Sequence, residues 1–100
     1  MKSLFFTHQH QRYTQTLRIH YGLDGMKYII KMYEGEINGH EENEGYPTKY
    51  RYEFEEGMLN HIYEIRNELK NIGWIQKESQ EVHKTSFLRG EDIDAELLSN

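Results

Sequence analysis

Three segments in the first half of the chain alternate between apolar and other side chains, which is the pattern of strands in a half-buried sheet. They cover residues 16–21, 26–33 and 48–55. Gly22-Leu23-Asp24-Gly25 separates the first two and predicts a tight hairpin, because Asp-Gly suits a turn with positive φ. The side chains that alternation places on one face are Leu17, Ile19, Tyr21, Tyr28, Ile30, Met32, Tyr50, Tyr52 and Phe54.

A helical period follows these strands. Five apolar residues are spaced four, three, four and three positions apart, which forms one continuous face of a helix over residues 58–72: Met58, Ile62, Ile65, Leu69 and Ile72. Gly73 is the expected C-terminal cap, which would fold Trp74 back toward Leu69. No Ser, Thr, Asp or Asn stands where the start of this helix would be capped. Because a helix of this length is marginal alone, we expect its apolar face to pack on the sheet.

The remaining segments complete an α+β fold. Residues 4–9 suggest a short edge strand, and 74–88 suggest one strand or a further hairpin. Ile93 and Leu97 lie one turn apart in an acidic tail, consistent with a short C-terminal helix. We therefore predict a single domain over 1–100, with 1–12 and 90–100 as candidate loose ends. Its antiparallel meander of four to five strands carries one amphipathic helix, in the order β-β-β-α-β-(β).

The connection over residues 34–47 is the most acidic part of the pattern. It contains five glutamates, three glycines and the only proline, and it has neither Lys nor Arg. A loop of this length and composition is either mobile or functional. The sequence thus predicts an acidic loop beside the sheet.

Composition and charge restrict the class of protein. The formal net charge of −5 argues against a general nucleic-acid binder, since phosphate contacts supply most non-specific affinity. The chain has no cysteine, so disulfides, thiolate nucleophiles and Cys-ligated zinc are excluded. No apolar run resembles a secretory signal or approaches a membrane span. These features lead us to expect a soluble, cytoplasmic protein without a cofactor.

No motif for catalysis emerges. His8 and His10 would project to the same side of a strand, and His20 could join them in a three-histidine zinc site, but HExxH is absent. The carboxylate pairs lie in hydrophilic stretches where both members stay ionised, so they do not suggest acid–base chemistry. The glycines form no phosphate-binding motif. A metal-dependent enzyme built on these histidines is therefore the third of three hypotheses, and we expect no enzyme.

The second face of the predicted sheet, opposite the helix, mixes basic and other side chains. Alternation places Lys27, Ile29, Lys31, Tyr33, Lys49 and Arg51 there. Basic and aromatic residues on a sheet can bind single-stranded nucleic acid, which is the second hypothesis. They are equally compatible with an ordinary solvent-facing sheet surface. What covers this face is therefore the central functional question.

The first hypothesis is a binding or inhibitor protein that docks on another protein. The small size, the acidic segments and the many tyrosines, a residue type enriched in interface hot spots, favour it. Accessory proteins of mobile elements, such as immunity, antitoxin or anti-defence proteins, share this profile. An exposed strand edge would also permit a homodimer. The expected partner-contact residues are Tyr33, Glu41, Glu42, Glu44 and Tyr46, with Lys31 and Arg51 as the basic alternative.

Overall fold

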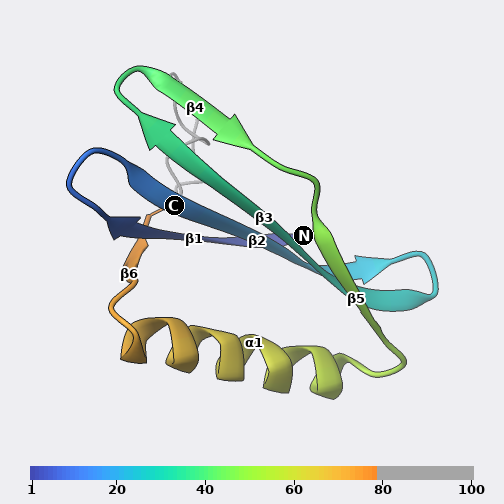
Figure 1. The fold of residues 1–100 in the computed structure, drawn as a ribbon. Helices are drawn as coiled ribbons and strands as arrows, with labels where there is room; N and C mark the ends of the chain where they lie inside the picture. The colour runs from blue at the N-terminus through green and yellow to red at the C-terminus, as the bar shows by residue number, and fades with distance from the viewer. Residues whose placement is uncertain (79–100) are drawn as a thin grey trace, which may run out of the picture.

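Six antiparallel strands and one helix make up residues 1–78, the part of the chain that the computed structural model describes (Figure 1). The elements are β1 (Lys2–Gln9), β2 (Thr14–Asp24), β3 (Lys27–Asn38), β4 (Glu41–Glu44), β5 (Thr48–Tyr52), α1 (Glu55–Asn71) and β6 (Ile75–Lys77). The sheet runs in the order β4-β3-β2-β1-β6, and β5 pairs with β3 beside β4. The predicted α+β class, with an antiparallel sheet and one packed helix, is confirmed.

The long hairpin of β2 and β3 forms the centre of the sheet. Its ladder extends from Thr14 opposite Ile37 to Asp24 opposite Lys27. The turn between the strands contains Gly25, whose φ of 67° is the left-handed conformation that a tight hairpin requires. The hairpin predicted from Asp24-Gly25 is thus confirmed, although both strands are longer than the alternating pattern indicated.

The prediction of an acidic loop over 34–47 is wrong. β3 continues to Asn38, and β4 pairs back against it after a turn at Gly39, which again has a φ of 67°. The chain leaves the ladder only at residues 45–47, where the Gly45 amide donates a 2.9 Å hydrogen bond to the Glu34 carbonyl. β4 and β5 therefore follow the same edge of β3 one after the other, as Figure 1 shows. β3 and β4 pair despite their negative charge because Arg18 of β2 forms ion pairs with Glu42 and Glu44.

β1 occupies a more central place than expected. It pairs with β2 along its whole length, from Lys2 opposite Tyr21 to Gln9 opposite Thr14. On its other side it pairs with β6, which starts directly after the helix cap. Residues 2–9 are therefore an internal strand, neither the edge strand nor part of the loose end that the sequence indicated. β1 is internal because β6 pairs with it, and a strand of only three residues is difficult to predict from the sequence.

The helix α1 covers one face of the sheet (Figure 1). Phe54 precedes it without a side-chain cap, in agreement with the absence of a capping residue in the sequence. At the other end, the Gly73 amide donates to the Lys70 carbonyl and the Trp74 amide to the Leu69 carbonyl, with Gly73 at a φ of 98°. This pair of bonds is a Schellman motif. It confirms the predicted cap and directs Trp74 back onto the helix.

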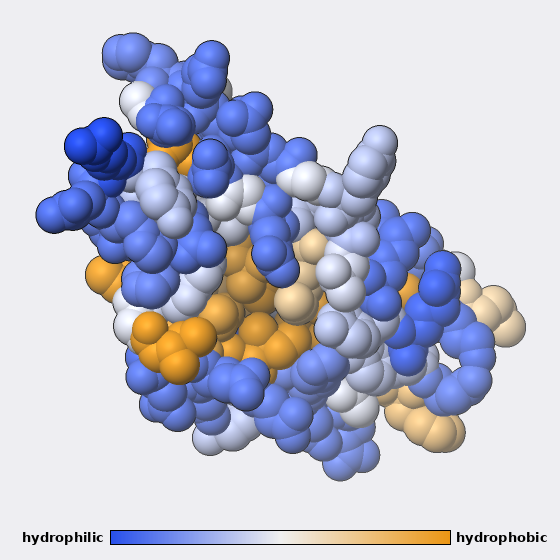
Figure 2. Space-filling model, in the orientation of Figure 1, coloured by the Kyte–Doolittle hydropathy of each residue, from blue (hydrophilic) through white to orange (hydrophobic). Residues whose placement is uncertain are grey.

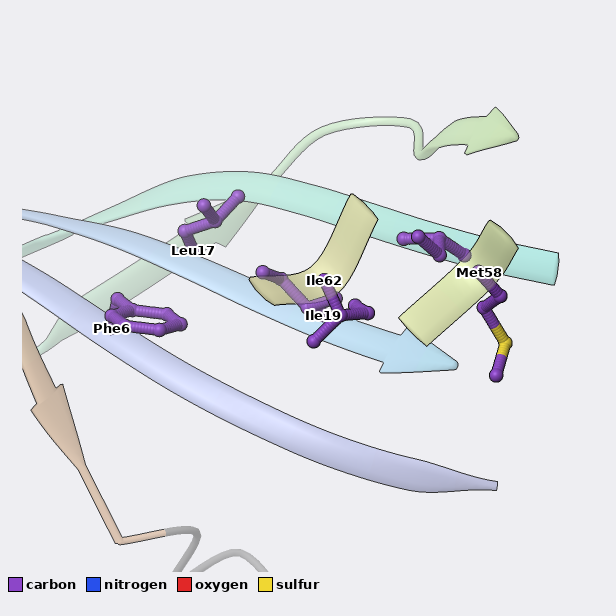
Figure 3. Close-up of a cluster of buried hydrophobic side chains, with 6 residues drawn as sticks. Phe6, Leu17, Ile19, Met58 and Ile62 are labelled. Carbon is purple, nitrogen blue, oxygen red and sulfur yellow. The ribbon is translucent and has the colours of Figure 1, made fainter. Parts of the chain in front are cut away.

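The hydrophobic core lies between α1 and strands β1 to β3 (Figure 3). Its buried members are Phe6, Leu17, Ile19, Ile30, Met58 and Ile62, with Ile65, Leu69, Tyr28 and Tyr52 packed around them. Two predicted contacts fail, however. Ile72, at 63% exposed, is the cap residue beyond the last helical turn, and Phe54, at 75% exposed, follows the end of β5, where alternation has stopped. Tyr50, at 38% exposed, lies on the predicted face at the rim of the core, with its ring against His61 of α1.

No helix within residues 1–78 is both long and apolar enough to cross a membrane. The expected C-terminal helix at Ile93 and Leu97, and the continuation of the last strand to residue 88, lie outside the described residues.

Candidate functional site: the second face of the sheet

The register of the strands assembles the second face, which is the side of the sheet opposite α1. Residues that alternate with the core positions occupy it, and direct pairing brings them into rows across the strands. This face includes Phe5, Arg18, His20, Ile29, Lys31, Tyr33, Glu42, Glu44, Lys49 and Arg51. Ile29 is only 2% exposed, so this face has an apolar position of its own away from the main core.

One row on this face is basic. His20 of β2 stands opposite Lys31 of β3, and Lys31 stands opposite Lys49 of β5. The His20 Nδ1 is 2.8 Å from the Ser3 hydroxyl oxygen, which holds the imidazole in the row. Like charges directly opposite each other on a sheet destabilise it. Within residues 1–78 neither lysine has an ion pair, and the same holds for neighbouring Arg51, so this end offers uncompensated positive charge.

The other end of the face is acidic and partly neutralised. Glu44 lies opposite Gly35, and Glu42 lies opposite Ile37. Arg18 Nη1 donates to Glu42 Oε2 and, at 3.1 Å, to Glu44 Oε2, while its guanidinium carbon lies 4.4 Å from the centre of the Phe5 ring. Burial alone would lower the pKa of Arg18, but the hydrogen bonds and charges of the two glutamates outweigh it and raise that pKa. Two carboxylates against one cation leave a net negative end.

The second face is therefore bipolar. Gly35, which pairs with Glu44, lies four positions after Lys31 on β3, so the basic row and the nearest β4 glutamate are about 13 Å apart at 3.3 Å per residue. Tyr33 lies between them, opposite Arg18, with its ring against His20 at 5.7 Å between centroids. An aromatic centre flanked by opposite charges is an arrangement that fits a protein surface of complementary charge.

The predicted partner-contact residues are brought together in part. Lys31, Tyr33, Arg51, Glu42 and Glu44 all lie on the second face. Glu41 pairs with Asn38 and points to the other side of the sheet. Tyr46 lies in the short link between β4 and β5 and is 98% exposed. The hairpin thus divides its glutamates between two faces, which a loop would not do.

The three histidines of the metal hypothesis do not come together. The ring centroids of His8, in β1, and His10, just after the end of β1, are 4.8 Å apart. His20 pairs with Ser3, which places it on the second face, whereas His8 pairs with Gln15 and lies on the helix side. His10 instead contacts Gln15 Oε1 at 2.7 Å and stacks on Tyr13. No group of three or more potential metal ligands occurs among residues 1–78.

A groove on the helix side was not predicted from the sequence. It has a volume of about 380 Å³ and lies between the C-terminal half of α1 and strands β2 and β3. Figure 2 shows it as an apolar hollow between sheet and helix, bordered by hydrophilic residues. His61 at its wall shares a hydrogen bond with the Tyr52 hydroxyl and packs its ring edge on Tyr50. These contacts join α1 to β5.

No protein-family model matches the chain, and no curated protein or solved structure matches it either.

Proposed function

We propose that this is a non-enzymatic binding protein that docks on another protein through the second face of its sheet. The bipolar charge of that face is the observation that supports it. The partner surface would present carboxylates to Lys31, Lys49 and Arg51 and basic side chains to the β4 glutamates. Such complementarity speeds association and fixes the orientation of docking. An inhibitor of the accessory type expected from the sequence would use this docking to cover a functional site of its partner.

The central residues of the face support a protein interface for a second reason. Tyr33, Phe5 and the stem of Arg18 form a rigid aromatic and apolar centre surrounded by charge. Buried interfaces draw their affinity mainly from such central anchors, with tyrosine and arginine enriched among them. The outer charges then contribute less energy but select the partner.

The test compares partner capture by the full-length protein and by charge-reversed variants of equal net charge. K31E/R51E reverses the basic end, and K2E/R12E changes two exposed basic residues elsewhere by the same amount. We expect a protein captured by the wild type to be retained by K2E/R12E and reduced at least about tenfold by K31E/R51E, in line with the loss of a charged hot spot. The measurement is quantitative mass spectrometry of material recovered from cell extract.

Two outcomes would contradict the proposal. Equal recovery of the same proteins by all variants would show that the second face does not contact them. Recovery of no protein, even by the wild type, would show that the extract contains no stable partner. Light scattering of the purified protein distinguishes self-association, the homodimer that a free strand edge permits, from docking on a different protein.

A second candidate function is binding of single-stranded nucleic acid at the basic row. The direct opposition of Lys31 and Lys49 favours it, since a phosphate between them would relieve their repulsion. The glutamates about 13 Å away weigh against it, because they repel a strand that continues along β3. Titration of single-stranded DNA and RNA with salt tests this function. No binding at low salt, where the attraction is strongest, would exclude it.

A further inference from the structure

The groove on the helix side is a second site, independent of the second face. Its floor is apolar, formed by Leu17 and Met32 of the sheet and by Ile65 and Leu69 of the helix. Its volume of about 380 Å³ falls within the range of small-molecule sites. From His61 to Ile72 the helix wall extends about 16 Å at 1.5 Å per residue. The groove is thus long enough for a compact organic molecule.

The charge at the rim of this groove has one sign. Glu34 of β3 and Glu68 of α1 line it from opposite walls, and within residues 1–78 the lining includes neither Lys nor Arg. Among the described residues, neither carboxylate takes part in an ion pair. A shallower hollow continues from Glu34 toward the hairpin and adds Glu36. A ligand in the groove would therefore experience a negative potential on both sides.

Aromatic rings complete the lining. Trp74 closes one end, where the Schellman motif fixes its backbone and the His8 ring packs on it at 5.3 Å between centroids. Tyr50 and His61 stand along the wall, in edge-to-face contact with each other. The faces of such rings attract cations, and tryptophan does so most strongly. Rings and carboxylates at one cavity both select for positive charge.

We propose that the groove binds an organic cation with an apolar or aromatic body. The body lies on the floor of Leu17, Ile65 and Leu69, and the charged group lies within reach of the rings and of Glu34 or Glu68. A neutral apolar molecule would gain the floor contacts alone. An anion of the same shape would be repelled by both carboxylates.

Trp74 gives the experiment its own signal, because it is the only tryptophan in the chain. Full-length protein is titrated with benzyltrimethylammonium, with its uncharged isostere neopentylbenzene and with benzenesulfonate, while tryptophan fluorescence is recorded. We expect saturable binding of the cation, at least about tenfold tighter than the neutral compound, from the cation–π and carboxylate attraction together. Benzenesulfonate should show no saturable change.

The matched variants are E34Q/E68Q and E64Q. The first removes both rim charges and keeps their shape, and the second changes an exposed glutamate of the same helix that lies outside the groove lining. We expect E34Q/E68Q to weaken the cation about tenfold and E64Q to leave its affinity unchanged within a factor of two. The three residues changed lie outside the core, so thermal unfolding of both variants should resemble that of the wild type.

The proposal is overturned by any of three results. The first is a linear fluorescence decrease shared by all three probes, which indicates collisional quenching without saturable binding. The second is binding of the neutral isostere as tight as that of the cation. The third is wild-type affinity of E34Q/E68Q for the cation. None of these results bears on capture of a protein by the second face, which uses different residues.

Discussion

Replacement of Gly35 by alanine tests how closely the β3–β4 hairpin is packed. Gly35 pairs with Thr16 on one side and with Glu44 on the other. A Cβ at this position would lie 2.3 Å from the Asn43 carbonyl oxygen, 3.0 Å from the Thr16 hydroxyl and 3.2 Å from the Glu44 Cα. Gly35 does not have a left-handed φ, so the constraint is space and not backbone conformation.

The size of the effect follows from these distances. Real Cβ contacts do not fall below 3.0 Å, so the Asn43 carbonyl must move by at least 0.7 Å, the difference between 3.0 and 2.3 Å. Overpacking of this kind costs about 1–3 kcal/mol. Loss of glycine entropy from the unfolded chain offsets about 0.4–1 kcal/mol of that cost. We expect G35A to lose about 1–2 kcal/mol of unfolding free energy, a fall in Tm of about 5–15 °C.

The assay is urea denaturation followed by far-UV circular dichroism, with G45A as the control. A Cβ at Gly45 would meet only the Glu34 carbonyl oxygen at 3.7 Å, an ordinary contact, and Gly45 has no left-handed φ. G45A should therefore be neutral or gain up to about 1 kcal/mol. If G35A is as stable as G45A, β4 does not pack on β3 as described. The placement of Glu42 and Glu44 on the second face would fail with it.

Three further tests, each by denaturant unfolding, probe other contacts. The Thr16 hydroxyl is buried without a partner among the described residues, so T16V should gain up to about 1 kcal/mol of unfolding free energy. T14V removes the hydrogen bond that the Thr14 hydroxyl donates to Gln9, so it should lose about 1 kcal/mol. Gly73 at the C-terminal end of α1 has a left-handed φ, so G73A should lose about 1–2 kcal/mol of unfolding free energy. Gly57 lies within the helix, where alanine is favoured over glycine, so G57A should gain about 0.5–1 kcal/mol. Burial, assisted by the charges of neighbouring Tyr50 and Glu64, raises the pKa of Tyr52 above its ordinary 10.0. Because the unfolded chain loses that proton first, this contribution to stability is present below about pH 10 and is lost as the pH rises further, and Y52F should show a smaller alkaline loss than the wild type.

The sequence predicted well the elements whose signal is local. The spacing of Met58, Ile62, Ile65 and Leu69 defines a helix and its buried side at once, and these four residues pack on the sheet. Gly73 followed by Trp74 predicted the Schellman motif because that motif depends on a few consecutive residues. The same periodicity predicted that Ile72 is buried as well, which is wrong because the helix ends one residue earlier, at Asn71.

The β3–β4 hairpin was missed because what stabilises it lies elsewhere in the chain. Residues 34–44 contain few apolar side chains and neither Lys nor Arg, which is the composition of a loop. The counter-charge comes from Arg18, 24 positions before Glu42, and becomes visible only once the register of β2 on β3 is known. Gly39 was the one local signal, since its left-handed φ closes the turn.

Pairing also changes the interpretation of the second face. The sequence placed Lys27 on a mixed face with Lys31 and Arg51, but Lys27 forms an ion pair with Glu53. Arg18, which lies on the same face, is paired with two glutamates. Among residues 1–78 the unpaired positive charge is therefore confined to one end of the sheet, and the hairpin brings an excess of negative charge to the other end. A uniformly basic sheet would favour a nucleic-acid strand, whereas a face with separated charges favours a protein whose surface carries the opposite pattern.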